Sequence, residues 1–336
     1  MQTLVLGATG FIGSNIARAL VAHGHRVRVL RRSRSSTLAL DGVDVQYVTG
    51  DVTDTASLVA AMQGVSAVFH VAGYYPPNSL NSRKAMRIAV AGMRAVLDAA
   101  AVAQVQHIIY TSSLSTIGTP TEGRTLSDER DHYLPGSVNN PYFEAKWAME
   151  CEAYRAALAG QRVVMLCPTI VFGPGDVKPT SGSAVIALAR GMLPAYIDGK
   201  TNAIDVRDVA EAHIAALEQG RSGERYILGG RNTTVLALTQ TAAQLLGVRV
   251  PRRQVSASLA MLVGRASEVA MQALPKKPLF PLTEAIEMIR HGQHYDISKA
   301  EDELGLAARP IDEALRDGVA WFRQHGYLDT PQAATV

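Results

Sequence analysis

The sequence predicts an α/β fold: a doubly wound parallel sheet with a smaller, mostly helical C-terminal region that would hold a substrate. Short apolar runs alternate with helical patterns over the first half of the chain. Three glycines, Gly7, Gly10 and Gly13, lie between the first run and the first helix. After Gly173-Pro174-Gly175 the alternation loosens. Apolar strands that alternate with helices are typical of a parallel sheet covered on both faces, with right-handed crossovers.

The elements of the first half follow from apolar periodicity. Runs rich in apolar residues predict strands at 3–6, 26–30, 45–48, 67–71, 107–110 and 163–166. Apolar residues at helical spacing predict helices at 14–23, 56–62 and 83–102. A further helix is expected to begin near Pro141, because proline suits the first helical position.

The second half is less regular. Residues 176–200 are rich in Pro, Gly, Ser and Thr, with a short helix near 184–189, and 204–218 indicates a strand end and a helix that return to the sheet. The remainder is mostly helical, with breaks at Pro251, Pro275, Pro278 and Pro281. The predicted division is therefore a dinucleotide-binding domain, 1–172 and 201–228, interleaved with a substrate region, 173–200 and 229–330.

Composition excludes several classes of protein. The 336 residues are 47% apolar and 19% charged, as in ordinary globular proteins, and the net charge of +3 does not indicate nucleic acid. Cys151 and Cys167 are too few for a disulfide scaffold. No metal-ligand spacing, signal peptide or apolar run long enough to span a membrane is evident. We expect a cytoplasmic protein with a small-molecule substrate and without a metal, nucleic-acid or membrane partner.

The glycine-rich loop predicts a nucleotide site. It follows a strand and opens a helix, where glycines let the backbone approach a pyrophosphate and the helix N-terminus offers unpaired N–H groups. A plain strand–helix turn is the alternative. The residues expected to contact the cofactor here are Gly7, Thr9, Gly10, Phe11, Ile12 and Gly13.

The end of the second strand indicates which cofactor is preferred. NAD-binding proteins commonly carry an acid there, which bonds the ribose hydroxyls. This chain has Arg31, with Arg32 beside it, and guanidinium groups bind a 2′-phosphate well. We therefore predict NADP(H), with NAD(H) as the lesser alternative and a solvated basic loop as the non-binding one.

Two later strand ends complete the predicted cofactor site. Asp51, followed by Val52, could accept from the adenine amino group or could cap a helix. Ala72 and Gly73 are small enough to let the cofactor pass. His70, which precedes them, is expected to be a packed core histidine rather than a catalyst.

Tyr142 and Lys146 predict proton transfer. They are four residues apart and so share a helix face, where the ammonium favours the phenolate. Tyr142 is then a proton donor in reduction and an acceptor in oxidation, and Lys146 would also hold the nicotinamide ribose. Ser113 ends the fifth strand, at the ligand-binding edge of such sheets, and is expected to bond the reacting oxygen, while Ser112 meets backbone or cofactor. A surface Tyr and Lys on an amphipathic helix is the alternative.

With these motifs the chain resembles the extended short-chain dehydrogenases/reductases of the NAD-dependent epimerase/dehydratase group, which have a Rossmann fold. The resemblance covers nearly the whole length and includes Gly7 to Gly13, Gly50-Asp51-Val52, Thr111-Ser112-Ser113 and Tyr142 with Lys146. It implies that Ser113, Tyr142 and Lys146 form a catalytic triad and that Pro168, Thr169 and Val171 line the nicotinamide. It also implies a homodimer, paired through the long helices at 83–102 and 141–158.

Within the family the chain is similar to dihydroflavonol-reductase-like proteins and hopanoid-associated sugar epimerases, but three positions depart from related patterns. Ile170 stands where many nucleotide-sugar enzymes have Asn, Ala89 replaces an Asn of the central helix, and Gly118 replaces an Asn of the flavonoid reductases. The candidate substrate residues are apolar with phenolic tips, which suits a hydrophobic carbonyl compound. They are Tyr74, Tyr75, Ile170, Met192 and Tyr196.

Three functions follow from the sequence. The favoured one is an NADP(H)-dependent oxidoreductase that interconverts a carbonyl and an alcohol on a small hydrophobic substrate. The alternative is a nucleoside-diphosphate-sugar epimerase or dehydratase that retains its cofactor. The third is a non-catalytic NADP(H) sensor, although such relatives typically lack the Tyr and Lys that are present here.

Overall fold

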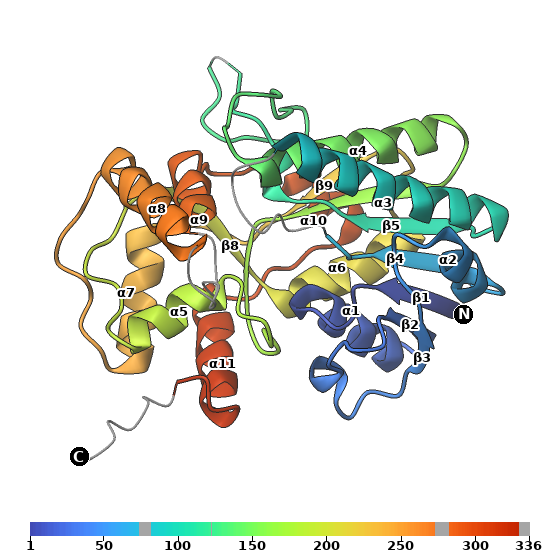
Figure 1. The fold of residues 1–336 in the computed structure, drawn as a ribbon, viewed down its shortest axis with the longest axis horizontal. Coiled ribbons are helices and arrows are strands. Elements are labelled where there is room, and N and C mark those ends of the chain that lie inside the picture. The colour runs from blue at the N-terminus through green and yellow to red at the C-terminus, as the bar shows by residue number, and fades with distance from the viewer. Residues whose placement is uncertain (74–81, 122, 273–281, 329–336) are drawn as a thin grey trace.

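The computed structural model describes residues 1–73, 82–121, 123–272 and 282–328, which form a larger and a smaller lobe (Figure 1). The larger lobe is a parallel sheet between two layers of helices, so the predicted doubly wound α/β fold is confirmed. The smaller lobe contains a second sheet and helices α5, α7, α8, α9 and α11.

The main sheet has seven parallel strands in the order β3-β2-β1-β4-β5-β6-β9. From β1 the chain runs first to β2 and β3 on one side, and later to β4 on the other, so the order reverses at β1. Ligands bind such sheets outside the carboxyl ends of the strands at this reversal. The strands are β1 (Gln2–Leu6), β2 (Arg26–Arg31), β3 (Gln46–Thr49), β4 (Ala67–His70), β5 (His107–Thr111), β6 (Val163–Pro168) and β9 (Arg225–Leu228).

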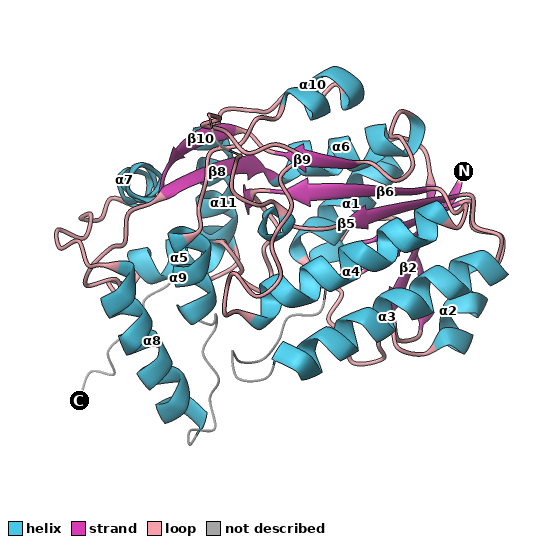
Figure 2. Cartoon of the chain, turned by 90° about the horizontal axis from the view of Figure 1, so that it is seen from above, coloured by secondary structure: helices cyan, strands magenta, loops and turns pink. Residues whose placement is uncertain are grey.

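Helices cover both faces of this sheet (Figure 2). One apolar core lies beneath α1 (Phe11–Ala22) and α6 (Val206–Glu218), and a second lies beneath α2 (Thr55–Met62), α3 (Ser82–Val102) and α4 (Pro141–Leu158). Helix α1 begins at Phe11 rather than at the predicted Ser14. This places its N-terminus directly after the glycine loop. Proline is at the first helical position of α4, as predicted.

The smaller lobe is built on three short strands, in the order β10-β8-β7. The sequence pattern does not predict β7 and β10, because both are short and β10 consists of Arg231-Asn232-Thr233-Thr234, without an apolar run. The strands are β7 (Ile170–Phe172), β8 (Lys200–Asp205) and β10 (Arg231–Thr234). The helices are α5 (Gly182–Ala189), α7 (Val235–Leu246), α8 (Ala257–Gln272), α9 (Leu282–Arg290) and α11 (Ile311–Gln324).

One late helix returns to the larger lobe. Helix α10 (Ser298–Leu304) packs on β9 and α6, and its Ala300 and Leu304 join the core beneath α1. The predicted division places this segment in the substrate region, so the chain crosses between the lobes more often than that division implies.

Candidate active site

The glycine loop is held against the end of β4. Gly7 has φ +89°, and a Cβ there would lie 2.7 Å from the Ala72 backbone nitrogen. Gly10 donates its N–H to the Gly7 carbonyl at 3.0 Å. No side chain caps α1 at Gly10 within the described residues, which leaves the N–H groups of its first turn open. This open helix end after a tight turn fits a dinucleotide pyrophosphate. Thr9, Phe11, Ile12 and Gly13 all belong to this loop and first turn.

The end of β2 presents the basic pair predicted to select the cofactor. The Arg31 guanidinium lies 5.4 Å from the centre of the Tyr47 ring on β3 and donates to the Ser33 carbonyl at 3.4 Å. Arg32 is exposed. Neither arginine forms a salt bridge within the described part of the chain, although the charge of Arg32 contributes to the lowered pKa of Asp51.

Asp51 lies after β3 and organises the turn there. Its carboxylate accepts from the Thr53 backbone N–H at 3.0 Å and from the Thr53 hydroxyl at 2.8 Å. These bonds lower the pKa of Asp51 below its usual value, so the group is ionised at neutral pH. The helix cap of α2 is Asp54, which accepts from Ala56 N–H. Asp51, with half-buried Val52 next to it, is therefore not the helix cap.

Ser113 and Tyr142 meet at the carboxyl end of β5. Ser113 begins the short turn η2 (Leu114–Thr116), and its Oγ accepts from the Ser115 backbone N–H at 3.1 Å. The Tyr142 hydroxyl donates to the same Oγ at 3.2 Å. Asn140 caps α4 by accepting from the Tyr142 backbone N–H, and this bond fixes the position of the Tyr142 backbone at the start of the helix. Ser113 and Tyr142 are both buried, so the pair lies in a shielded environment.

Lys146 lies one turn further along α4 and is also buried. Its ammonium donates to the carbonyls of Thr111 at 3.1 Å and Ser112 at 3.3 Å, at the end of β5. Burial lowers the pKa of Lys146 from its ordinary 10.5 to about 8. The ammonium is thus still mostly charged at neutral pH. The structure brings the predicted Ser113, Tyr142 and Lys146 together.

His70 lies beneath this set, inside the sheet. Its ring is buried and tilted against the Tyr110 ring at 5.5 Å between centres. Burial, with a smaller contribution from the Lys146 charge, lowers the pKa of His70 to about 3. His70 is therefore neutral at physiological pH, which fits the core role expected from the sequence.

A buried ion pair lies behind the site, and no sequence pattern predicts it. Glu150 accepts from the hydroxyls of Ser112 at 2.5 Å and Thr116 at 2.8 Å, and its other oxygen accepts from Arg225 at 2.8 Å. Ser112 and Thr116 lie on either side of Ser113 in the chain, so this carboxylate holds the turn that presents Ser113.

Ser112 is held by protein groups on every side. Its hydroxyl donates to Glu150, its carbonyl accepts from Lys146, and its backbone N–H donates to the Leu166 carbonyl at 2.6 Å. These contacts fit the expectation that Ser112 meets backbone, and its contact with the cofactor stays a prediction.

Arg225 completes the network from β9. Its guanidinium also donates to the backbone carbonyls of Thr116, Glu129 and Asp131, so every N–H it has is used. The sequence holds one signal for Glu150: it is four residues after Lys146 and eight after Tyr142, on the same helix face. Nothing local points to Arg225.

The other predicted residues are spread around this centre. Pro168 ends β6; Thr169 donates its hydroxyl to the Asn202 side chain at 2.9 Å; and Val171 packs in the core with Phe11. Ala72 and Gly73 follow β4 and are half-buried. Whether each contacts the cofactor stays a prediction.

Among the described residues, the structure does not bring the predicted substrate residues together at one place. Ile170 packs with Leu114 and Ile117 beside the turn η2 that follows Ser113. Tyr196 instead pairs through its backbone with Arg253 and Val255, and Met192 is 65% exposed after α5. Tyr74 and Tyr75 lie outside the described residues.

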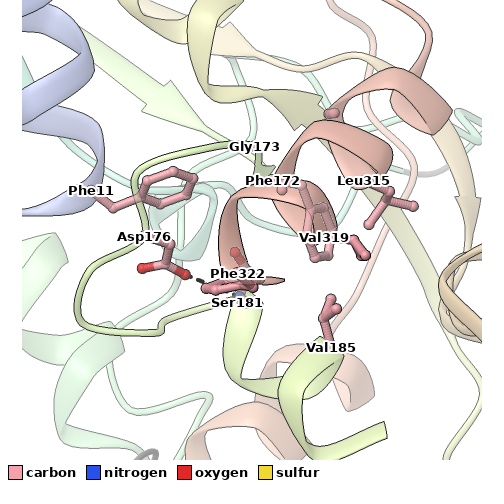
Figure 3. A pocket seen from close by; sticks show the side chains of 12 residues that line it. Phe11, Phe172, Gly173, Asp176, Ser181, Val185, Leu315, Val319 and Phe322 are labelled. Atoms are coloured by element: carbon pink, nitrogen blue, oxygen red, sulfur yellow. Dashed lines mark hydrogen bonds between the residues drawn. The ribbon is translucent and has the colours of Figure 1, made fainter. Parts of the chain in front are cut away.

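A small cavity lies between Phe11, β7, α5 and α11 (Figure 3). Its volume is about 10 Å³, room for roughly one water molecule. Its lining is mostly apolar apart from Asp176 and Ser181, and it includes none of Ser113, Tyr142 and Lys146. We therefore do not assign the substrate to it.

The order of the features along the chain, with the nucleotide loop first and the tyrosine and lysine on a later helix, places the protein among the extended short-chain dehydrogenases/reductases. The chain belongs to the NAD dependent epimerase/dehydratase family, whose model matches residues 3–229. Several relatives are named as reductases and dehydrogenases, and this protein is an enzyme of the same nicotinamide-dependent family.

Three relatives illustrate the range of this similarity. A Synechocystis sp. protein provisionally named dihydroflavonol 4-reductase is 34% identical, over 97% of this chain and 96% of that one. Sterol demethylase protein B of Methylococcus capsulatus is 30% identical, over 98% of this chain and 100% of that one. A crystal structure of a nucleoside-diphosphate-sugar epimerase from Pseudomonas aeruginosa has a TM-score of 0.81 at 29% identity, over 98% of this chain and 99% of that one.

Proposed function

We propose that this protein is an NADP(H)-dependent oxidoreductase that interconverts a carbonyl and an alcohol on a hydrophobic substrate. The observation that carries the proposal is the 3.2 Å hydrogen bond between Tyr142 and Ser113, one helical turn from the buried Lys146. A phenol, a hydroxyl and an ammonium at the ligand-binding edge are suited to move a proton to or from one oxygen atom.

Each side chain has a distinct role in reduction. The Ser113 oxygen already accepts two hydrogen bonds, from Ser115 N–H and Tyr142, so its own proton can be donated to the reacting oxygen. When substrate is bound, Tyr142 turns its one phenolic proton from Ser113 to the reacting oxygen and transfers it there. Lys146 stabilises the phenolate that is left and binds the nicotinamide ribose. When bound, the nicotinamide supplies or accepts the hydride.

The proposed preference for NADP(H) rests on Arg31 and Arg32. They occupy the end of β2, where an acid would repel a 2′-phosphate, and Tyr47 supports the Arg31 guanidinium from one side. Two guanidinium groups at this point supply both positive charge and paired N–H donors for such a phosphate.

The proposed hydrophobic substrate rests on the apolar wall beside the catalytic turn. Ile170 packs there with Leu114, Ile117 and Met288, and none of these side chains could hydrogen-bond a sugar nucleotide. The names of several relatives point the same way, among them dihydroflavonol 4-reductase, sterol demethylase and cinnamoyl-CoA reductase.

A second candidate is a nucleoside-diphosphate-sugar epimerase that retains its cofactor. It is favoured by the similarity to the Pseudomonas aeruginosa protein, which is named as such an epimerase. Such an enzyme would purify with bound cofactor and would show no net consumption of NADPH.

The test is NADPH consumption, followed by absorbance, against a panel of hydrophobic ketones and aldehydes. Wild type should turn over at least one compound, and Tyr142→Phe should lose about 10²–10⁴-fold in rate while it still binds NADPH. Tyr154→Phe, on the same helix, is the control and should stay active. Turnover that survives in Tyr142→Phe would refute the assigned role, and activity on nucleotide sugars alone would favour the epimerase.

A further inference from the structure

The outer face of helix α8 is apolar and exposed. Leu259, Leu262 and Val263 are 53%, 68% and 57% exposed, and Ala266 is exposed beside them. These positions are three, four and seven residues apart, so they form one stripe along the helix. Scattered apolar side chains on a surface are ordinary, whereas a continuous helical stripe marks a contact surface.

The opposite face of α8 already has a partner. Met261 and Gly264 are buried, where α8 packs on α9. In both views α8 lies at the periphery of the smaller lobe (Figures 1 and 2). The exposed stripe is thus a second apolar face, not an edge of the core.

The chain around this stripe is strongly basic. Residues 225–283 contain eight of the 33 Lys and Arg residues but one of the 30 Asp and Glu residues, Glu268. The rest of the chain, with 25 basic and 29 acidic residues, is net negative. The positive charge of the protein is therefore concentrated in the segment that carries α8.

Four of these basic residues are exposed and close to the stripe in the chain: Arg265 lies on α8 itself, and Arg249, Arg252 and Arg253 precede it. None of them forms an ion pair within the described part of the chain, although ion pairs are common elsewhere on the surface. An apolar stripe with unpaired cations beside it in the chain matches a layer of anionic headgroups over acyl chains.

We propose that α8 binds a negatively charged membrane surface, with Leu259, Leu262 and Val263 below the headgroups and the arginines at the lipid phosphates. No helix among the described residues is long and apolar enough to cross a membrane, and α8 has 16 residues. Helix α8 therefore lies in the interface and does not span it. The expectation of no membrane partner rests on spanning segments alone, so it does not address a contact of this kind.

The position of α8 places the proposed membrane contact close to the candidate active site. Helix α9, beneath it, carries Met288, which packs with the Tyr142 and Phe143 cluster. One helix layer thus separates the proposed lipid-facing surface from the catalytic phenol. The inference goes beyond the proposed reaction, and lipid binding can be measured whether or not a carbonyl substrate is found.

The test is co-sedimentation of the full chain with vesicles of phosphatidylcholine alone or mixed with phosphatidylglycerol. We expect binding to the anionic vesicles, little binding to the neutral ones, and weaker binding as salt rises. Leu262→Glu with Val263→Glu should bind at least about tenfold more weakly. Arg252→Ser with Arg253→Ser should lose about fivefold for each arginine, and only on anionic vesicles.

The matched control is Leu158→Glu, which alters a side chain 90% exposed on α4, far from α8 in the chain, and should bind vesicles like wild type. Unchanged NADPH affinity and thermal unfolding show that each variant is folded. Equal binding by all variants, or no binding by wild type, would overturn the proposal. A third result would also overturn it: wild type does not bind vesicles, and light scattering shows that it forms a dimer which the Leu262→Glu, Val263→Glu variant does not form.

Discussion

At the scale of single residues, the buried carboxyl group of Asp176 lowers the stability of the folded protein at neutral pH. Its carboxyl group is buried beside the glycine loop and accepts the backbone N–H groups of Thr180 and Gly182 at 2.8 and 3.2 Å. Burial outweighs these bonds and raises the pKa of Asp176 from 3.8 to about 6. The folded protein therefore binds this proton more tightly than the unfolded chain, and stability falls as pH rises from about 4 to about 6.

Asp176→Asn should be more stable than wild type at pH 7. The amide oxygen can still accept both N–H groups, while the buried charge is gone, so the gain is of order 1–3 kcal/mol. Denaturant unfolding at pH 7 and pH 4 measures it, and the gain should shrink at the lower pH. Asp41→Asn, at an exposed position, should change little. A variant less stable than wild type at pH 7 would contradict this explanation.

Arg31 is the residue on which cofactor choice is predicted to depend. Arg31→Asp should raise the dissociation constant of NADPH by more than about tenfold and that of NADH by far less, because only NADPH carries the 2′-phosphate. Fluorescence titration with both cofactors checks this. Arg34→Asp alters an exposed arginine three residues on and is the control. An equal loss for both cofactors would refute the predicted contact.

Among the elements, α4 and β9 are joined by the Glu150–Arg225 pair behind the turn η2 that follows Ser113. The two side chains are 4% and 3% exposed. Breaking a buried pair leaves one charge uncompensated, which typically costs about 3–5 kcal/mol. Because Glu150 also holds Ser112 and Thr116, the pair ties protein stability to the placement of Ser113.

Glu150→Gln should therefore lower stability by a few kcal/mol and lower kcat more than it raises KM. Urea unfolding and steady-state kinetics measure the two effects. Glu152→Gln, on the same helix, is the control: its partners Arg94 and Arg155 are 55% exposed, so less than about 1 kcal/mol should be lost. Full activity and stability in Glu150→Gln would show that the network is dispensable.

The sequence predicts the elements that have strong local signals. The glycine loop, the strand end at Ser113 and the face shared by Tyr142 and Lys146 each depend on residues close together in the chain. Strands β7 and β10 escape prediction because short strands lack a clear periodicity. Glu150 escapes it because a single acidic residue on a helix does not show which neighbour it faces, and Arg225 is 75 positions away.

At the scale of the whole molecule, the predicted assembly is a homodimer through α3 and α4. The two helices pack side by side on one face of the sheet (Figure 2). Their outward positions include the exposed Ala91 and Cys151, small enough to let another helix approach. Light scattering should give twice the 35.9 kDa of one chain, and Ala91→Arg should give the mass of one. A single-chain mass for wild type would refute the prediction.

The division into lobes can be predicted only coarsely. The loosened pattern after Gly175 marks where the chain leaves the main sheet, but the return of α10 to β9 and α6 depends on contacts that no local pattern reveals. For the same reason, the distances that make Ser113 an acceptor for Tyr142 come from the fold rather than from spacing.

The place of β9 has a consequence for how the chain is made. Its partner β6 ends at Pro168, and β9 ends at Leu228, after the chain has passed through the smaller lobe. During synthesis about 60 residues must be added before β6 is covered, roughly 3–12 s at ordinary translation rates. Throughout that interval the nascent protein presents an unpaired strand, whose residues are all buried in the finished fold, to its surroundings, and such an edge is a site where newly made chains aggregate. A chaperone that covers β6 during this interval should therefore reduce aggregation of the newly made chain.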